Sequence, residues 1–267
     1  MLYNDKFTIV ANWKMNPDSY QQAQNLFENY LHITNLQKIN LIVAVPYIYL
    51  GLLSNINQDI SPVALSAQNL SAFNNGAVTA EISASMLKNF SINYSIIGHS
   101  ECRYNYQEKE ELINKKFILA LKHQINPIIC IGESKQQFDA GELVIEQHLI
   151  AQLEHIVKAI NNTECNQLSI FIAYEPIWAI GSNVALSNDY IEKKCKFITD
   201  YIGYWLDKNI NCYVLYGGNV SNQNIDSISN IKGLSGVLVG RNSLDIVKFA
   251  EICRKSGDKI CKNHIFN

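Results

Sequence analysis

The chain has 267 residues, of which 48% are hydrophobic and 17% are charged. That composition provides enough apolar material for a large core and too little charge for a disordered chain. A formal net charge of -2 creates no basic field to attract nucleic acid or an anionic membrane surface. We therefore expect neither nucleic acid nor a membrane as a partner, and any anionic ligand must be bound by local groups.

Seven cysteines are scattered along the chain without Cys-x-x-Cys pairs. This odd, dispersed set argues against a disulfide framework and against a zinc site, and it indicates reduced thiols. The first six residues lack the apolar segment of a secretory signal. No apolar run approaches the ~20 residues that span a bilayer. The sequence thus predicts a soluble cytoplasmic protein without a bound metal.

Eight short apolar runs recur at fairly even spacing, and several are rich in Ile and Val. They are Phe7–Ala11, Leu41–Val45, Val63–Ala67, Tyr94–Gly98, Pro127–Ile131, Leu168–Ala173, Cys212–Tyr216 and Gly236–Val239. Nearly continuous apolar runs are typical of parallel strands that are buried on both faces. Each interval between them is long enough for a crossover helix.

Two of these intervals show helical periodicity clearly, at residues 110–123 and 143–160. No linker rich in Pro, Gly or Ser divides the chain, and strands that alternate with helices indicate a parallel α/β fold. Eight repeats favour a single-domain (β/α)8 barrel with eight parallel strands over residues 1–255, followed by a tail at 256–267. On pattern alone, a doubly wound open sheet remains the alternative.

Polar residues follow several runs, at the end of a barrel where chemistry is carried out. Asn12 and Lys14 follow the first run, His99 the fourth and Glu175 the sixth. A carboxylate base beside a neutral electrophile suits the abstraction of a proton α to a carbonyl. Glycines follow the last two runs, where many barrels bind phosphate.

The segments around these positions form a set of motifs in a fixed order. They are Ala-Asn-Trp-Lys-Met-Asn (11–16), Ala-Gln-Asn (67–69), Gly-Ala-Val-Thr (76–79), Gly-His-Ser-Glu (98–101) with Arg103, Ile-Cys-Ile-Gly-Glu (129–133), Ala-Tyr-Glu-Pro-Ile-Trp-Ala-Ile-Gly (173–181), Tyr-Gly-Gly (216–218) and Leu-Val-Gly (238–240). Together they resemble the triosephosphate isomerase family over about residues 6–255, and the motif at 173–181 is the most specific.

The resemblance implies a TIM barrel that interconverts dihydroxyacetone phosphate and D-glyceraldehyde 3-phosphate through a cis-enediolate, without a cofactor, in glycolysis and gluconeogenesis. Glu175 is then the base and His99 the electrophile that polarises the carbonyl. Lys14 supplies positive charge to a substrate that Asn12 helps to position. In that family the histidine is neutral and lies at a helix N-terminus.

The resemblance also assigns supporting and binding residues. Glu101 is expected to pair with Lys14 or a neighbouring polar group, and residues 176–183 to form a lid that excludes water. Thr79 matches a loop that reaches a neighbouring subunit, which implies a homodimer. The phosphate-binding positions, which use backbone N–H groups, are Gly181, Asn219, Gly240 and Arg241.

The sequence departs from the family pattern near these positions. Ala80 stands where the family has Gly after its loop Thr, and Cys102 stands where a basic residue is common. Asn183 and Asn219 replace a Gly and a Ser that meet when the lid closes, so we expect the Asn219 side chain to accept a hydrogen bond from the Asn183 N–H. Arg241 replaces a Gly, and we expect an unstrained backbone there.

Two other functions remain open at the level of sequence. One is another phosphate-binding barrel enzyme, such as an aldolase or epimerase, which would need a Schiff-base Lys or a metal set at the strand ends. The other is a barrel that serves as a surface adhesion or interaction protein. The set of Asn12, Lys14, His99 and Glu175 favours the isomerase over both.

Overall fold

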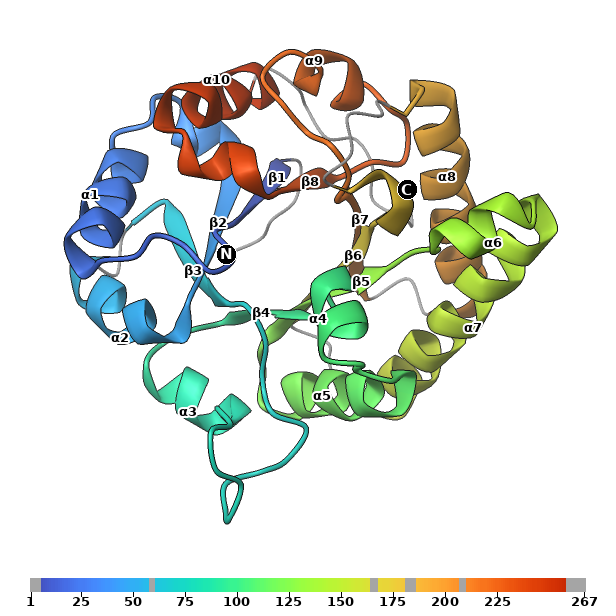
Figure 1. Cartoon of the computed structure of the whole chain (residues 1–267), viewed down its shortest axis with the longest axis horizontal. Coiled ribbons are helices and arrows are strands. Elements are labelled where there is room, and N and C mark those ends of the chain that lie inside the picture. The colour runs from blue at the N-terminus through green and yellow to red at the C-terminus, as the bar shows by residue number, and fades with distance from the viewer. Residues whose placement is uncertain (1–5, 58–60, 164–167, 181–185, 207–209, 258–267) are drawn as a thin grey trace.

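Eight parallel strands close into a barrel in the computed structural model, which describes residues 6–57, 61–163, 168–180, 186–206 and 210–257 (Figure 1). The strands are β1 (Phe7–Asn12), β2 (Ile39–Val45), β3 (Val63–Ala67), β4 (Tyr94–Ile97), β5 (Asn126–Ile131), β6 (Ser169–Tyr174), β7 (Asn211–Tyr216) and β8 (Gly236–Val239). Each strand pairs with its neighbours in sequence, and β1 pairs with β8 to close the ring. The predicted (β/α)8 barrel is confirmed, and the open sheet is excluded.

Helices surround the barrel on its outside (Figure 1). They are α1 (Tyr20–Leu31), α2 (Tyr47–Ile56), α3 (Ala84–Asn89), α4 (Ser100–Asn105), α5 (Glu110–Lys122), α6 (Lys135–Asp139), α7 (Glu142–Asn161), α8 (Asn188–Trp205), α9 (Ile225–Ile228) and α10 (Ile246–Ser256). Short 3-10 helices lie at η1 (Leu36–Lys38), η2 (Ile177–Ala179) and η3 (Arg241–Leu244). Residues 258–267 of the predicted tail lie outside the described residues.

The core has two layers, because successive residues of each strand point to opposite faces. On β6, Phe171 and Ala173 point into the barrel, while Ile170 and Ile172 pack outward against the helices. Inside the barrel the Phe171 ring stacks on Tyr213, with 5.2 Å between ring centroids. The nearly continuous apolar runs of the sequence are the consequence of burying both faces.

Among the described residues, none of the helices combines the length and the apolar character that crossing a bilayer requires. None of the five cysteines in this part of the chain forms a disulfide, and four of them are buried. Burial, and secondarily the nearby Glu108 carboxylate, raise the pKa of the Cys102 thiol to about 11. The Cys102 thiol therefore stays protonated at neutral pH.

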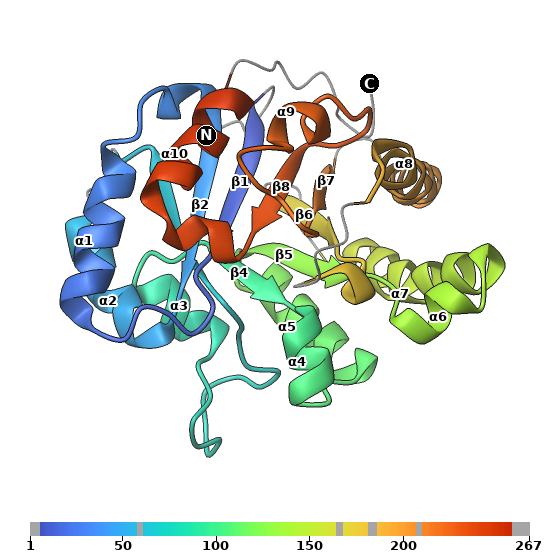
Figure 2. The same ribbon diagram turned by 45° about the horizontal axis from the view of Figure 1, so that its top comes forward.

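A long loop, residues 68–83, connects β3 to α3 and extends away from the barrel in both views (Figures 1 and 2). Thr79 and Ala80 are exposed in this loop. Ala80 has a φ of 74°, in the left-handed region that an L-residue with a Cβ adopts at a cost. The departure from Gly at this position therefore places a methyl group on strained backbone.

Ala80→Gly is expected to raise the free energy of unfolding by about 0.5–1 kcal/mol, because relief of the left-handed strain outweighs the greater entropy of the unfolded glycine chain. Urea unfolding at fixed protein concentration measures this. Ala140→Gly is the matched control: Ala140 is exposed with a φ of -75°, so the same change there should not stabilise. Equal effects of the two substitutions would contradict the assignment of strain to Ala80.

Candidate active site

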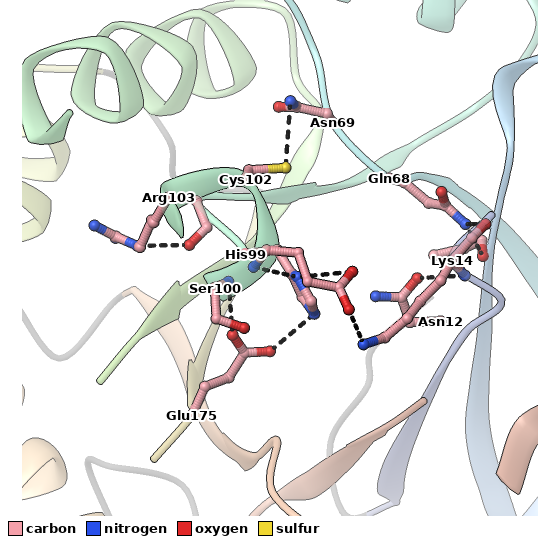
Figure 3. Close-up of polar contacts among 12 residues, drawn as sticks. Asn12, Lys14, Gln68, Asn69, His99, Ser100, Cys102, Arg103 and Glu175 are labelled. Carbon is pink, nitrogen blue, oxygen red and sulfur yellow. Dashed lines mark hydrogen bonds and ion pairs between the residues drawn. The ribbon is translucent and has the colours of Figure 1, made fainter. Parts of the chain in front are cut away.

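Side chains from three strands converge at the carboxyl end of the barrel (Figure 3). Asn12 ends β1, His99 follows β4, and Glu175 directly follows β6. Together with Lys14 they line one open cavity of about 600 Å³. The structure thus brings all four residues of the predicted catalytic set to one place.

The Glu175 side chain is only 2% exposed and lies between two groups of the β4 end (Figure 3). Its Oε2 accepts a hydrogen bond from the Ser100 backbone N–H at 3.0 Å, and its Oε1 lies 3.3 Å from His99 Nε2. A buried carboxylate is stable only where such donors replace water. The sequence did not predict this contact of Ser100 with Glu175, although Ser100 follows His99 directly in the Gly-His-Ser-Glu motif.

Two glycines make room for Glu175 and allow no side chain. A Cβ at Gly217 would lie 2.8 Å from Glu175 Cγ, and a Cβ at Gly132 would lie 1.8 Å from the Glu175 carbonyl oxygen. Gly132 also has a φ of 158°. Gly217 therefore packs directly against the Glu175 side chain and Gly132 against the Glu175 backbone, and only glycine permits this approach.

His99 is the N-cap residue of α4, which begins at Ser100. Its Nδ1 accepts a hydrogen bond from the Glu101 backbone N–H at 3.2 Å. An imidazole nitrogen that accepts carries no proton, so the proton of the neutral ring lies on Nε2. Nε2 is the atom that faces Glu175, which leaves an N–H donor at the cavity wall.

Lys14 has a left-handed backbone, with a φ of 54°. Two hydrogen bonds hold this conformation: Lys14 N–H donates to Asn12 Oδ1 at 3.0 Å, and Gln68 Nε2 donates to the Lys14 carbonyl at 2.8 Å. The Lys14 ammonium pairs with Glu101 (Figure 3). A residue with a strained backbone keeps that conformation only where its surroundings hold it. At Lys14 this conformation places the side-chain ammonium in the cavity.

The opposite end of the cavity is formed by backbone that follows β7 and β8. A Cβ at Gly218 would lie 2.1 Å from the Tyr216 hydroxyl oxygen, so only glycine fits. Asn219 is exposed there, and Arg241 begins η3 without a positive φ, which is the unstrained backbone expected for it. Gly181 and Asn183 lie outside the described residues, so the expected contact between Asn183 and Asn219 does too.

Cys130 lies in β5 beneath the carboxylate and is 1% exposed. Burial and the neighbouring Glu175 carboxylate raise the pKa of its thiol well above the usual value. A protonated, inaccessible thiol cannot serve as a nucleophile. Within the described ranges, no group of three or more His, Cys, Asp or Glu side chains is arranged to hold a metal ion.

A buried glutamate, a histidine whose Nε2 faces it and a lysine line one cavity at the carboxyl end of a (β/α)8 barrel, which is where barrel enzymes carry their active sites. The chain matches the family described as "Triosephosphate isomerase" over residues 7–256. It therefore belongs to the triosephosphate isomerase family and is an isomerase.

Curated relatives agree with this assignment over nearly their whole length. A triosephosphate isomerase of Blochmanniella floridana is 34% identical over 262 residues, which cover 96% of this chain and 98% of the relative. One of Mesomycoplasma hyorhinis is 35% identical over 253 residues, covering 92% and 97%. One of Finegoldia magna is 36% identical over 249 residues, covering 91% and 96%.

Proposed function

We propose that this protein interconverts dihydroxyacetone phosphate and D-glyceraldehyde 3-phosphate by proton transfer through a cis-enediolate. The observation that carries the proposal is the contact of Glu175 with His99 Nε2 in a cavity that Lys14 also lines. Both substrates are anionic α-hydroxy carbonyl compounds, and this set of groups meets the needs of such a substrate. The chemistry requires only the movement of protons, so the proposal includes no cofactor.

Glu175 is proposed to take a proton from one carbon of the substrate and to return it to the adjacent carbon. The carboxylate is held by the Ser100 N–H and by His99, so it is positioned before substrate arrives. A positioned base avoids the entropy cost of bringing base and substrate together. Gly217 packs against the Glu175 side chain and so limits the positions that the carboxylate can take.

His99 is proposed to donate its Nε2–H to the substrate oxygens and so to stabilise the negative charge that develops on them. A neutral imidazole that already carries this proton can both give it and recover it, because Nδ1 is occupied by the Glu101 N–H. Lys14 is proposed to add positive charge, and Asn12 to support the Lys14 backbone through its side-chain oxygen. Glu101 is proposed to orient the Lys14 ammonium.

The phosphate is proposed to bind at the glycine-rich end, through backbone N–H groups of Gly181, Asn219, Gly240 and Arg241. Exposed N–H groups on turns that allow close approach suit a phosphate dianion. Residues 176–183 are proposed as a lid, and the apolar side chains of Ile177 and Ile180 line the cavity. Excluding water matters because an enediolate phosphate otherwise eliminates its phosphate.

The chain is proposed to act as a cytoplasmic homodimer. Free thiols fit a reducing compartment. For the dimer, the exposed loop that carries Thr79 also carries Phe73, which is 51% exposed, and Met15 after β1 is 90% exposed. Apolar surface of this kind is typical of an interface.

Sedimentation equilibrium is expected to give twice the chain mass of 30.2 kDa. Thr79→Arg places a long charged side chain in the proposed interface, so it should shift the protein toward the single chain and lower its activity. Thr163→Arg is the control, because Thr163 follows α7 and is not part of the loop at 68–83. A wild-type protein that sediments as one chain at micromolar concentration would rule out the dimer.

A coupled assay with D-glyceraldehyde 3-phosphate tests the proposed reaction. We expect turnover by the wild-type protein without added metal or cofactor. A Schiff-base aldolase would instead form a covalent adduct between substrate and a lysine when treated with borohydride, and we expect no such adduct here. The absence of isomerisation by the folded wild-type protein would overturn the proposal.

A further inference from the structure

Glu133 is a fully buried carboxylate, with 0% exposure, and no part of the proposed chemistry uses it. It follows Gly132 at the end of β5. Within the described part of the chain, the hydrogen bonds that its side chain accepts come from neutral donors: Tyr174, Trp178 and Tyr190. We call these four residues the Glu133 cluster. A buried charge that depends on neutral donors loses stability with each donor removed.

The three donors of the Glu133 cluster come from different elements. Tyr174 ends β6 and donates at 3.0 Å, Trp178 lies in η2 and donates from Nε1 at 2.9 Å, and Tyr190 lies in the first turn of α8 and donates at 3.1 Å. Burial raises the pKa of the Tyr190 hydroxyl above its usual value, so this group keeps its proton. One carboxylate therefore joins η2 to α8.

Tyr190 is itself held firmly in this place. Its backbone N–H donates to Ser187 Oγ at 3.3 Å, and the Lys194 ammonium lies 5.3 Å from the centre of its ring. Phe138 packs against Trp178, with 3.9 Å between ring centroids, and meets the Tyr190 ring edge-on at 6.2 Å. The aromatic contacts fix the rings, and the hydrogen bonds to Glu133 fix their orientation.

The Glu133 cluster is connected to the base through the backbone. The Glu133 carbonyl accepts a hydrogen bond from the Ile177 N–H at 3.0 Å, and the Ile131 carbonyl accepts one from the Glu175 N–H at 2.7 Å. Ile177 also lines the cavity. A displacement of Glu133 or Trp178 must therefore move the segment that begins with Glu175.

We propose that Tyr190 is a positioning residue for the base: through Glu133 it fixes Trp178 and, with it, the backbone from Glu175 to Ile177. This inference rests on the proposed isomerase function. Tyr190 does not line the cavity and touches no reacting atom. It acts on the chemistry only through the placement of the carboxylate and of the apolar wall beside it.

Tyr190→Phe removes the hydroxyl and keeps the ring. We expect kcat to fall about tenfold, because sub-ångström displacement of a positioned base is costly. KM should change by less than about twofold, because phosphate binding uses the other end of the cavity. The ratio of inorganic phosphate released to product isomerised should rise, because a displaced Ile177 leaves the enediolate less shielded from water.

The matched control is Tyr201→Phe, on the same helix but packed against Trp205 at 6.4 Å rather than against the Glu133 cluster. It should leave kcat, KM and phosphate release unchanged. Glu133→Gln completes a double-mutant cycle. If Tyr190 acts through the Glu133 carboxylate, then adding Tyr190→Phe to Glu133→Gln should cost little further activity.

Two results would overturn the inference while the wild-type protein isomerises its substrate. The first is a Tyr190→Phe protein with a lower melting temperature but unchanged kcat and phosphate release, because its role would then be structural. The second is the same fractional loss in kcat with and without Glu133→Gln, because Tyr190 would then act by another route. A wild-type protein without isomerase activity instead overturns the proposed function on which the inference rests.

Discussion

Glu175→Asp is expected to lower kcat for the isomerisation by at least about 100-fold, with little change in KM. The substitution keeps the carboxylate but shortens the side chain by one methylene group, so the carboxylate lies closer to the backbone. The shorter side chain cannot keep both its contact with the Ser100 N–H and its contact with His99 Nε2, which lie at 3.0 and 3.3 Å in the wild type. Steady-state kinetics in both directions, with melting temperatures to verify folding, measure the effect.

Glu111→Asp is the control for this substitution. Glu111 is exposed in the first turn of α5, so the same loss of one methylene should leave kcat unchanged. A Glu175→Asp protein with more than about a tenth of wild-type kcat would show that the carboxylate is not a positioned base. The isomerase could then still use Glu175 for binding, which KM would reveal.

His99→Gln is expected to lower kcat by about 10²–10³, the range found when one donor to a developing oxyanion is removed. The glutamine amide can donate a hydrogen bond, but it cannot give up a proton and recover it as an imidazole does. The loss should fall on kcat rather than KM, because the donor acts mainly on the charge that develops during reaction. Single-turnover rates of proton exchange at the substrate carbon isolate this step.

His155→Gln provides the matched comparison for His99. His155 is exposed on α7, and its replacement should not alter the kinetics. Because His99 also caps α4 by accepting from the Glu101 N–H, the His99→Gln protein should melt at a slightly lower temperature. If kcat were unchanged in a folded His99→Gln protein, another group would have to polarise the substrate.

Much of the fold follows from local patterns in the sequence. The Val63–Ala67 and Gly236–Val239 strands have the predicted bounds, because most of their residues are apolar and polar or turn residues flank them. β2 begins earlier than predicted, at Ile39, because Ile39 and Asn40 pair with Phe7 and Thr8 of β1. Pairing with a neighbouring strand can lengthen a strand beyond its apolar run. The sequence of one strand does not show where its neighbour begins, so it does not show this extension.

The site shows the same division between what is local and what is not. Asn12, His99 and Glu175 could be identified because each follows an apolar run, which is a local signal. The hydrogen bond from Ser100 to Glu175 joins residues that are 75 positions apart in the sequence, and the one from Tyr190 to Glu133 joins residues that are 57 positions apart. Contacts of this kind depend on how the strands and helices meet, so the sequence predicted the residues of the proposed site and the pairing of Glu101 with Lys14, but not the contacts of Ser100 and Tyr190.

The glycines beside Glu175 bear on how such a site can change by mutation. Gly132 and Gly217 have no functional side chain, yet neither position has space for even a methyl group, which would clash with the Glu175 backbone at Gly132 and with the Glu175 side chain at Gly217. In a library of all single substitutions, both positions should tolerate as little variation as Glu175 itself, while exposed cavity positions such as Arg241 should tolerate more. A position near this cavity can therefore be intolerant of substitution because it is crowded, and not only because it takes part in catalysis. We expect new specificities to arise more readily at exposed cavity positions than at the buried glycines beside Glu175.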